Sequence, residues 1–348
     1  MRIIEIGCST IGDYDGIGKH ARIVTEEFLK HKDIEFAELI SGNTVGFSKV
    51  EYIFSMEMCK AFLNAEKEIV HKNIDCVIVE YPFSEYNPLI LLAFQKLKRT
   101  CYKNHCLLAL SMHEYDRVNR IRRYVIRNFI KTADLVFVSE PYYLDKLKRL
   151  NNHLYLRTIP NHLPVENRKK EYGCNKEFVY FGLVNKSKAF KEMIGAWDAF
   201  NIDGDFHLNI VTATNLEFDE KDHRNISIFI GLNNQDVANI LWKCMFSIIP
   251  VIPNIGFNNS SFVSTSQCGC IPIGIFNERL NNLDFIIPIN SYDIDEFKHG
   301  LDKATKISED ECVSKSASAF SFGSKFTIQA TVDMMIEGIN KELRVTNI

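Results

Sequence analysis

The stretch 244–274 places polar groups where proteins commonly bind an anion. Phe246–Ile249 is an apolar run closed by Pro250, which predicts a strand buried on both faces. Ser260–Gln267 predicts a short helix with an Asn or Ser cap. A helix amino terminus at the carboxyl end of a parallel strand offers free N–H groups to an anion. An ordinary α/β repeat with a polar loop fits the same pattern. The loop residues of interest are Gly256, Asn258 and Asn259.

Two candidate sites lie in the first half of the chain. Gly16 and Gly18 follow the apolar strand Arg2–Gly7, so the backbone there can approach a ligand closely. A tight turn explains the same two glycines. His113 follows the buried strand Cys106–Ser111, and sheets of this kind hold ligands at the carboxyl ends of their strands. A hydrogen-bonded surface histidine is the alternative.

The elements that position these residues alternate between strands and helices in both halves. Short apolar runs predict the strands, and apolar residues at helical spacing predict the helices between them. The segment 165–176 is polar and charged, which predicts a boundary between two domains. The remaining predicted strands are Glu35–Ile40, Asp75–Glu80, Asp134–Ser139, Phe178–Leu183, Phe206–Thr212, Ile226–Gly231 and Ile271–Ile275.

Composition limits the classes of function. The chain has 348 residues, 46% of them hydrophobic and 24% charged, as in globular proteins. A net charge of −3 argues against a strongly basic protein that binds nucleic acid. Ten cysteines without a C-x-x-C pair suit a reducing cytoplasm. The amino terminus predicts a strand rather than a signal peptide, and no apolar run reaches the roughly 18 residues of a membrane span. We therefore expect a cytoplasmic protein.

Several motifs resemble those of the retaining, family-4-like glycosyltransferases of the GT-B fold. Gly256-Phe257 and the element Gly269–Ile273 resemble parts of the donor-site segment of that family. Ala133–Ser139 and Thr158–His162 resemble two elements near the end of its first domain. Both glutamates of the usual donor motif are absent. Ile255 stands at the first position, the second falls near Val263–Thr265, and no Asp or Glu occurs between Asp236 and Glu278.

The resemblance implies an α/β fold of two Rossmann-like domains facing a central cleft. Residues 1–166 would form the acceptor domain, 177–325 the nucleotide-sugar donor domain, and 326–348 a helix packing back on the first domain. Lys188 matches the family's diphosphate-binding Lys, whereas Leu183 stands in place of its Arg. Nearby Lys186 and Lys191 are alternative cations. His113 would contact the transferred sugar. The other donor-site residues implied are Gly16, Gly18, Gly182, Gly231, Gly256, Asn258, Asn259, Ser264 and Thr265.

These observations lead to a functional expectation with one main alternative. We expect a metal-independent, retaining glycosyltransferase for surface polysaccharide or glycoconjugate synthesis. Its partners would be a nucleotide-sugar donor and a glycan or lipid-linked acceptor, with no separate cofactor. The basic amphipathic stretch Arg117–Lys131 fits contact with the inner face of a membrane, a solvated face, or pyrophosphate binding. The alternative is a non-catalytic GT-B subunit that binds a glycan, nucleotide or protein. Phosphorylase chemistry is disfavoured because no lysine-anchored pyridoxal motif occurs.

Overall fold

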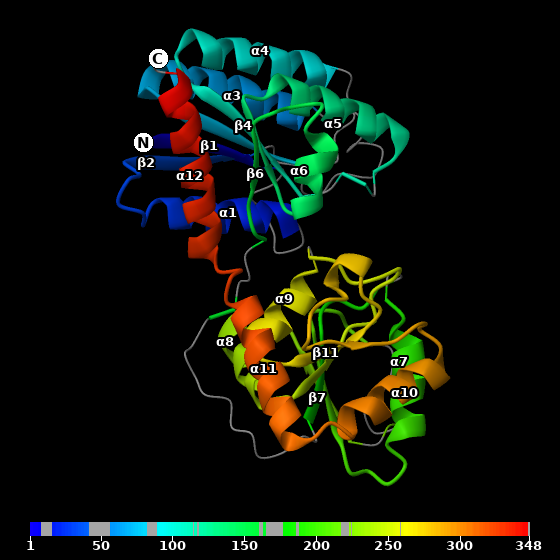
Figure 1. The fold of residues 1–348 in the computed structure, drawn as a ribbon. Coiled ribbons are helices and arrows are strands. Elements are labelled where there is room, and N and C mark those ends of the chain that lie inside the picture. The colour runs from blue at the N-terminus through cyan, green and yellow to red at the C-terminus, as the bar shows by residue number, and fades with distance from the viewer. Residues whose placement is uncertain are drawn as a thin grey trace. The chain divides into compact units, whose positions relative to one another are not determined.

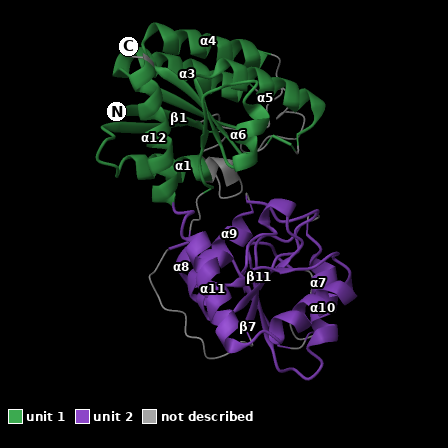
Figure 2. Ribbon diagram, in the orientation of Figure 1, with its two compact units in different colours: residues 1–160, 328–348 green, residues 161–327 purple. Residues whose placement is uncertain are grey.

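The computed structural model divides the chain into two compact units (Figure 2). Unit 1 comprises Met1–Pro160 and Ile328–Ile348, and unit 2 comprises Asn161–Thr327. The structure describes residues 1–7, 16–41, 56–81, 89–113, 115–116, 118–159, 163–164, 177–185, 188–216, 223, 225–257 and 259–346. Each unit is built around its own parallel sheet. The predicted alternation of strands and helices is therefore present in both halves.

Unit 1 contains a six-stranded parallel sheet in the order β2-β1-β3-β4-β5-β6. Strands β3, β4 and β5 are buried along their whole length, which explains their continuous apolar sequences. The strands are β1 (Arg2–Gly7), β2 (Phe36–Ser41), β3 (Cys76–Tyr81), β4 (Leu107–Met112), β5 (Leu135–Val138) and β6 (Leu154–Leu156).

Helices cover both faces of this sheet (Figure 1). Helices α3 (Glu57–Lys72), α4 (Leu89–Lys103), α5 (Arg120–Thr132) and α6 (Pro141–Leu147) pack on one face. Helix α1 (Gly16–Phe28) and α12 (Ile328–Thr346) pack on the other face. Helix α12 buries Val332, Met335, Ile336 and Ile339 there. The carboxyl-terminal helix is thus part of unit 1, although it follows unit 2 in the sequence.

Unit 2 repeats the architecture with the strand order β12-β11-β10-β7-β8-β9, again all parallel. Its strands are β7 (Glu177–Phe181), β8 (His207–Thr212), β9 (Ile226–Ile230), β10 (Phe246–Ile248), β11 (Ile271–Gly274) and β12 (Ile287–Pro288). Its helices are α7 (Phe190–Phe200), α8 (Asn234–Lys243), α9 (Ser260–Gln267), α10 (Ile294–Thr305) and α11 (Glu309–Gly323), with the short 3-10 turn η2 (Glu278–Leu280).

Helix α11 packs closely on α9 and ends at Gly323. A Cβ at Gly323 would lie 2.3 Å from the backbone nitrogen of Gln267. Only glycine permits this approach, so Gly323 allows α11 to support the helix that carries the predicted donor-site residues.

Candidate functional site

A cluster of ionisable side chains lies inside unit 1, near the carboxyl ends of its strands. Glu5 on β1 and Glu80 on β3 are both fully buried, as is Arg157, which follows β6. His20 on α1 is 3% exposed. Charged groups are rarely buried unless they are paired, because leaving water costs several kcal/mol. The contacts within this charged cluster therefore decide its charge state.

His113 connects the charged cluster to the surface. Its Nε2 lies 2.5 Å from Glu80 Oε2 and 2.9 Å from a terminal nitrogen of Arg157. Its backbone is fixed as well: its N–H donates to the Tyr81 carbonyl at 2.9 Å, and its own carbonyl accepts from the Ser139 hydroxyl at 3.4 Å. The imidazole is 13% exposed. The histidine that the sequence suggested as a site residue is therefore held in place by several hydrogen bonds at the carboxyl edge of the sheet.

The pKa values of the two buried carboxyl groups are shifted in opposite directions. Burial raises the pKa of Glu5 well above its usual value, and the neighbouring Glu80 raises it further. Burial alone would also raise the pKa of Glu80. His113, His20 and Arg157 outweigh that effect and hold the pKa of Glu80 below its ordinary range. Glu5 also accepts a 2.7 Å hydrogen bond from the Thr25 hydroxyl. Ionisation of the pair is therefore favoured at Glu80 over Glu5.

His20, Glu80 and His113 bring three potential metal-ligand atoms within 4.8 Å of one another. Arg157 argues against a metal site there. Its guanidinium nitrogen lies 3.7 Å from Glu80 Oε2 and 2.9 Å from His113 Nε2, so it already supplies the positive charge. A divalent cation between the same atoms would repel it. We assign no metal to these residues.

In unit 2, the start of α9 lies close to the end of β7. The side chain of Asn259 caps α9 by accepting from the Phe262 N–H at 2.8 Å. Gly182, which follows β7, has φ +141°, and a Cβ there would lie 2.7 Å from Ser261 Oγ. The glycine therefore permits both an unusual backbone angle and a close approach to the first turn of α9. This arrangement leaves N–H groups of the first turn available for an anion.

Lys188 lies next to the segment that precedes α9. It pairs with Val251 in an antiparallel bridge, and the N–H of Ala189 donates to the Pro250 carbonyl at 2.9 Å. The lysine is half-buried, and burial lowers its pKa to about 8. Burial is the one cause of this shift, without a contribution from a described carboxylate. Lys188 is thus a partly buried cation for which the described part of the chain supplies no ion pair.

The other predicted donor-site residues have varied positions. Thr265 is fully buried and donates to the Ser261 carbonyl at 2.8 Å within α9, and Ser264 is buried too. Asn259 is partly exposed, and Gly231, at φ +67°, is exposed after β9.

Gly256 is partly exposed, Lys191 is exposed on α7, and Leu183 is 56% exposed at the expected Arg position. Gly16 and Gly18 lie in the first turn of α1, whereas Asn258 and Lys186 lie outside the described residues.

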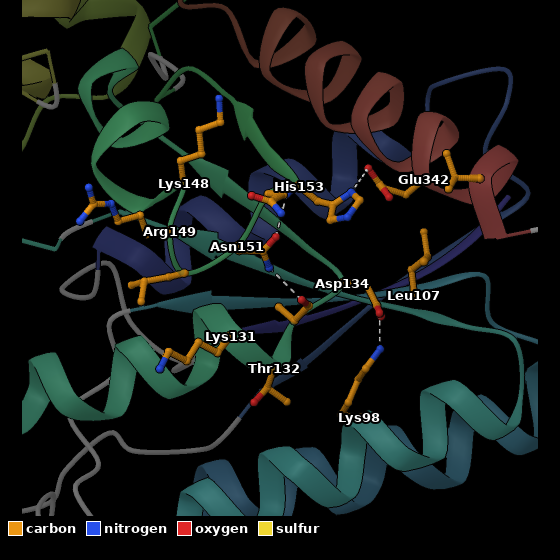
Figure 3. Close-up of a pocket in the computed structure, with 14 residues that line it drawn as sticks. Lys98, Leu107, Lys131, Thr132, Asp134, Lys148, Arg149, Asn151, His153 and Glu342 are labelled. Carbon is orange, nitrogen blue, oxygen red and sulfur yellow. Dashed lines mark hydrogen bonds and ion pairs between the residues drawn. The ribbon is translucent and has the colours of Figure 1, made fainter.

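The residues of unit 1 also line a pocket at the opposite edge of the sheet (Figure 3). Its volume is about 560 Å³, and it is lined by residues such as Leu107, Asp134 and His153, where β4, β5 and β6 begin. Lys98 pairs with Asp134, and His153 pairs with Glu342. The predicted sugar site at His113 lies at the other ends of these strands, so this pocket is separate from it.

Sequence reasoning missed the buried partners of His113. Glu5, Glu80 and Arg157 were not singled out as candidate site residues. A detectable signal was present for Glu5 and Glu80, because each is a charged residue within a run that the pattern assigns to a buried strand. Arg157 lies outside the predicted strands. Such a residue must find a partner of opposite charge or a hydrogen bond inside the fold.

Comparison with known proteins identifies the fold. No protein-family model matches the chain, and no curated protein matches it either. The N-terminal domain of a trehalose-6-phosphate phosphatase from Candida albicans has a TM-score of 0.68 at 12% identity, covering 98% of this chain and 97% of that chain. Alr3699/HepE from Anabaena, solved in complex with UDP, has a TM-score of 0.67 at 10% identity, with 98% and 100% covered. A structure described as trehalose-6-phosphate from E. coli bound with UDP-2-fluoro glucose has a TM-score of 0.62 at 11% identity, with 98% and 99% covered.

These similarities confirm the predicted fold class. The chain is an α/β protein with two parallel six-stranded sheets in a GT-B-like fold, and its carboxyl-terminal helix contacts α1. Among the described residues, no helix is both long enough and apolar enough to cross a bilayer.

Proposed function

We propose that the protein is a retaining glycosyltransferase that moves a sugar from a nucleotide-sugar donor to a hydroxyl of a glycan or lipid-linked acceptor. The observation that carries the proposal is Lys188. Its burial lowers its pKa to about 8, with no described carboxylate to offset the cost. Partly buried cations of this kind are typical of sites for anionic ligands. The diphosphate of a nucleotide sugar is such a ligand.

In this proposal unit 2 binds the donor. The N–H groups in the first turn of α9 and the ammonium of Lys188 stabilise the negative charge that grows on the leaving diphosphate. Gly182 lets the backbone approach the phosphates, Gly231 lies beside the base, and Asn259 is the most accessible candidate for the ribose. A metal ion is not needed for this charge stabilisation. The roles of Gly256, Ser264 and Thr265 stay predictions.

Unit 1 binds the acceptor and contributes His113 to the transferred sugar. The proposal of a lipid-linked acceptor is based on helix α5, because Arg120, Arg123 and Arg127 are exposed on this helix. Ile121 and Tyr124 on the same helix are 68% and 63% exposed. Cationic and apolar side chains together favour anionic lipid surfaces. We therefore propose a cytoplasmic protein that contacts the inner face of a membrane through the 117–131 region, in surface polysaccharide or glycoconjugate synthesis.

A donor screen tests the enzymatic part. The protein is mixed with UDP-, GDP-, ADP- and dTDP-sugars, and slow release of nucleotide is followed. We expect release from one of these donors. Lys188→Ala should then lower turnover by about 10²- to 10³-fold, comparable to the loss of one oxyanion donor. His113→Ala should lower turnover with a smaller effect on nucleotide affinity.

The alternative function, a non-catalytic GT-B subunit, is favoured by the missing glutamates of the donor motif. Calorimetry at millimolar nucleotide separates the two proposals. A wild-type protein that binds no nucleotide would exclude the transferase and favour the non-catalytic subunit. Binding with unchanged turnover in Lys188→Ala would instead exclude only the role of Lys188 and redirect attention to Lys186, Lys191 or the Gly16 region.

Membrane contact is tested by sedimentation with vesicles of phosphatidylglycerol and phosphatidylcholine. We expect binding that increases with the anionic lipid fraction and falls with salt, since each basic residue contributes about 1 kcal/mol near such a surface. Replacing Arg120, Arg123 and Arg127 together with Gln should abolish it. Vesicle binding that persists in this triple variant would contradict the assignment to α5.

A further inference from the structure

The pocket at the amino ends of β4, β5 and β6 is a second place where unit 1 can hold a ligand (Figure 3). Its volume of about 560 Å³ is within the range of small-molecule sites, roughly 300–1,000 Å³. Its walls come from α4, α5, α12 and the segment between α6 and β6, all within unit 1. Four lining residues are Lys or Arg and two are acids, so the lining has a net charge of +2 when His153 is neutral.

The two acids of the lining already have partners. Asp134 forms an ion pair with Lys98. The side chain of Glu342 is 7% exposed, and it accepts hydrogen bonds from Nδ1 of His153 at 2.9 Å and from the Tyr155 hydroxyl. Figure 3 shows Lys98 turned toward Asp134 and His153 turned toward Glu342. A ligand that enters the pocket therefore meets carboxylates whose oxygens already accept hydrogen bonds.

The other three cations of the lining, Lys131, Lys148 and Arg149, are exposed and have no ion pair within the part of the chain that the structure describes. Helix dipoles explain some preference for cations here, because α5 and α6 both end at this pocket. Each helix end carries about −0.5 elementary charge, so the two ends together offset at most about one positive charge. The lining therefore stays positive.

The segment that carries His153 is fixed to the end of α5. The Asn151 amide donates to the carbonyls of Ile130 and Ala133 at 2.8 and 2.9 Å, and its Oδ1 accepts from the His153 N–H at 2.8 Å. These bonds satisfy two carbonyls at the negative end of the helix. The His153 side chain is 50% exposed, and Glu342 engages its Nδ1, so Nε2 is the ring nitrogen left to meet a ligand.

We propose that this pocket is a second ligand site, which binds a phosphate monoester. Such a group carries nearly two negative charges at neutral pH, which matches the positive lining. The guanidinium of Arg149 can bind two phosphate oxygens at once, Lys131 and Lys148 add positive charge, and His153 adds a hydrogen bond through Nε2. The monoester belongs either to a soluble metabolite or to a lipid headgroup. Binding there does not depend on the proposed transferase activity.

Calorimetry with glycerol 3-phosphate tests the site with a soluble monoester. We expect the wild-type protein to bind it, and the affinity to fall as salt is added, because the contacts are exposed. The pocket variant Lys131→Gln/Lys148→Gln/Arg149→Gln should bind about 10- to 100-fold more weakly, as expected for the loss of three exposed charge contacts. His153→Gln should weaken binding by about two- to fivefold.

Two further proteins show whether the effect belongs to the pocket. The matched control Lys32→Gln/Lys67→Gln/Arg99→Gln removes the same charge from exposed positions of unit 1 outside the pocket, and it should bind as wild type does. Lys188→Ala removes the cation of the proposed donor site and should leave the affinity within about twofold of wild type. Binding that is lost in Lys188→Ala and kept in the pocket variant would overturn the proposal.

Vesicles distinguish the two sources of the monoester. Phosphatidic acid has the same headgroup as glycerol 3-phosphate, whereas phosphatidylglycerol is a phosphate diester. For a lipid ligand, vesicles with phosphatidic acid should bind more protein than phosphatidylglycerol vesicles of equal surface charge, and the pocket variant should lose this preference while the matched control keeps it. For a soluble ligand, only calorimetry should show the loss. A pocket variant that binds both probes as wild type does, or a wild-type protein that binds neither, would overturn the proposal.

Discussion

Replacing Lys188 by Met should stabilise the protein while weakening its binding of nucleotide. Burial lowers the pKa of this lysine from 10.5 to about 8. At about 1.4 kcal/mol per pH unit, that difference corresponds to at most about 3.4 kcal/mol of destabilisation at neutral pH. Because the side chain is half-buried, solvent screening reduces the expected gain of Lys188→Met to about 1–2 kcal/mol.

The stability gained by Lys188→Met should decrease as the pH rises. Below pH 8 both folded and unfolded chains carry the charged ammonium, so the folded state bears the full cost of burying it. Between pH 8 and 10.5 the folded chain loses its proton before the unfolded chain does, and the cost disappears. The advantage of Lys188→Met should therefore be greatest at pH 7 and nearly absent at pH 10.5.

The assay is urea unfolding of both proteins at several pH values between 7 and 10, with nucleotide binding measured by calorimetry at pH 7. Lys191→Met on the exposed face of α7 is the matched control and should change stability by less than about 0.5 kcal/mol. A Lys188→Met protein that is less stable than wild type at pH 7, or whose gain does not change with pH, would refute the reasoning.

Three further predictions address other parts of the fold and site. Gly182→Ala should cost about 1–3 kcal/mol in urea unfolding because of its φ of +141° and the 2.7 Å contact with Ser261, and a second change Ser261→Ala should recover only the contact part. Met335→Ala should cost about 2–5 kcal/mol and lower the melting of unit 1 in calorimetry, whereas Ile273→Ala should lower that of unit 2. Turnover should survive EDTA; activity that is lost with EDTA and restored by Mn²⁺ would contradict metal independence.

The fold could be predicted from the sequence because its buried parallel strands have short, continuous apolar sequences. Phe178–Leu183 was predicted as a strand, and β7 spans Glu177–Phe181. The sequence also predicted α9 with an Asn or Ser cap, and the structure has the same bounds, Ser260–Gln267, with Asn259 as the cap. It missed α11, whose serine-rich sequence lacks a clear apolar stripe, and the short strand β6. These elements depend on contacts with distant parts of the chain.

The candidate site was less predictable for a related reason. His113 and Lys188 could be proposed from motifs at the ends of strands, which is local information. Glu80 and Arg157 are 77 positions apart in the sequence, so no local sequence pattern predicts that these two residues pair. Likewise, the motif that suggested Thr265 as a donor-site residue did not reveal that its hydroxyl donates to the Ser261 carbonyl within α9. Motif spacing predicts an element, whereas the direction of a side chain follows from packing.

The charged groups inside the two units favour a functional site over a purely structural one. A buried ion pair such as Glu80–Arg157 gives little stability compared with apolar residues of the same volume, and replacing such pairs is often neutral or stabilising. Lys188 is half-buried without a described ion pair, so its charge lowers stability. A protein that needed only to fold would gain by losing both features. Their presence at the carboxyl edges of the sheets, where α/β folds hold ligands, supports the proposed binding of an anion and a sugar.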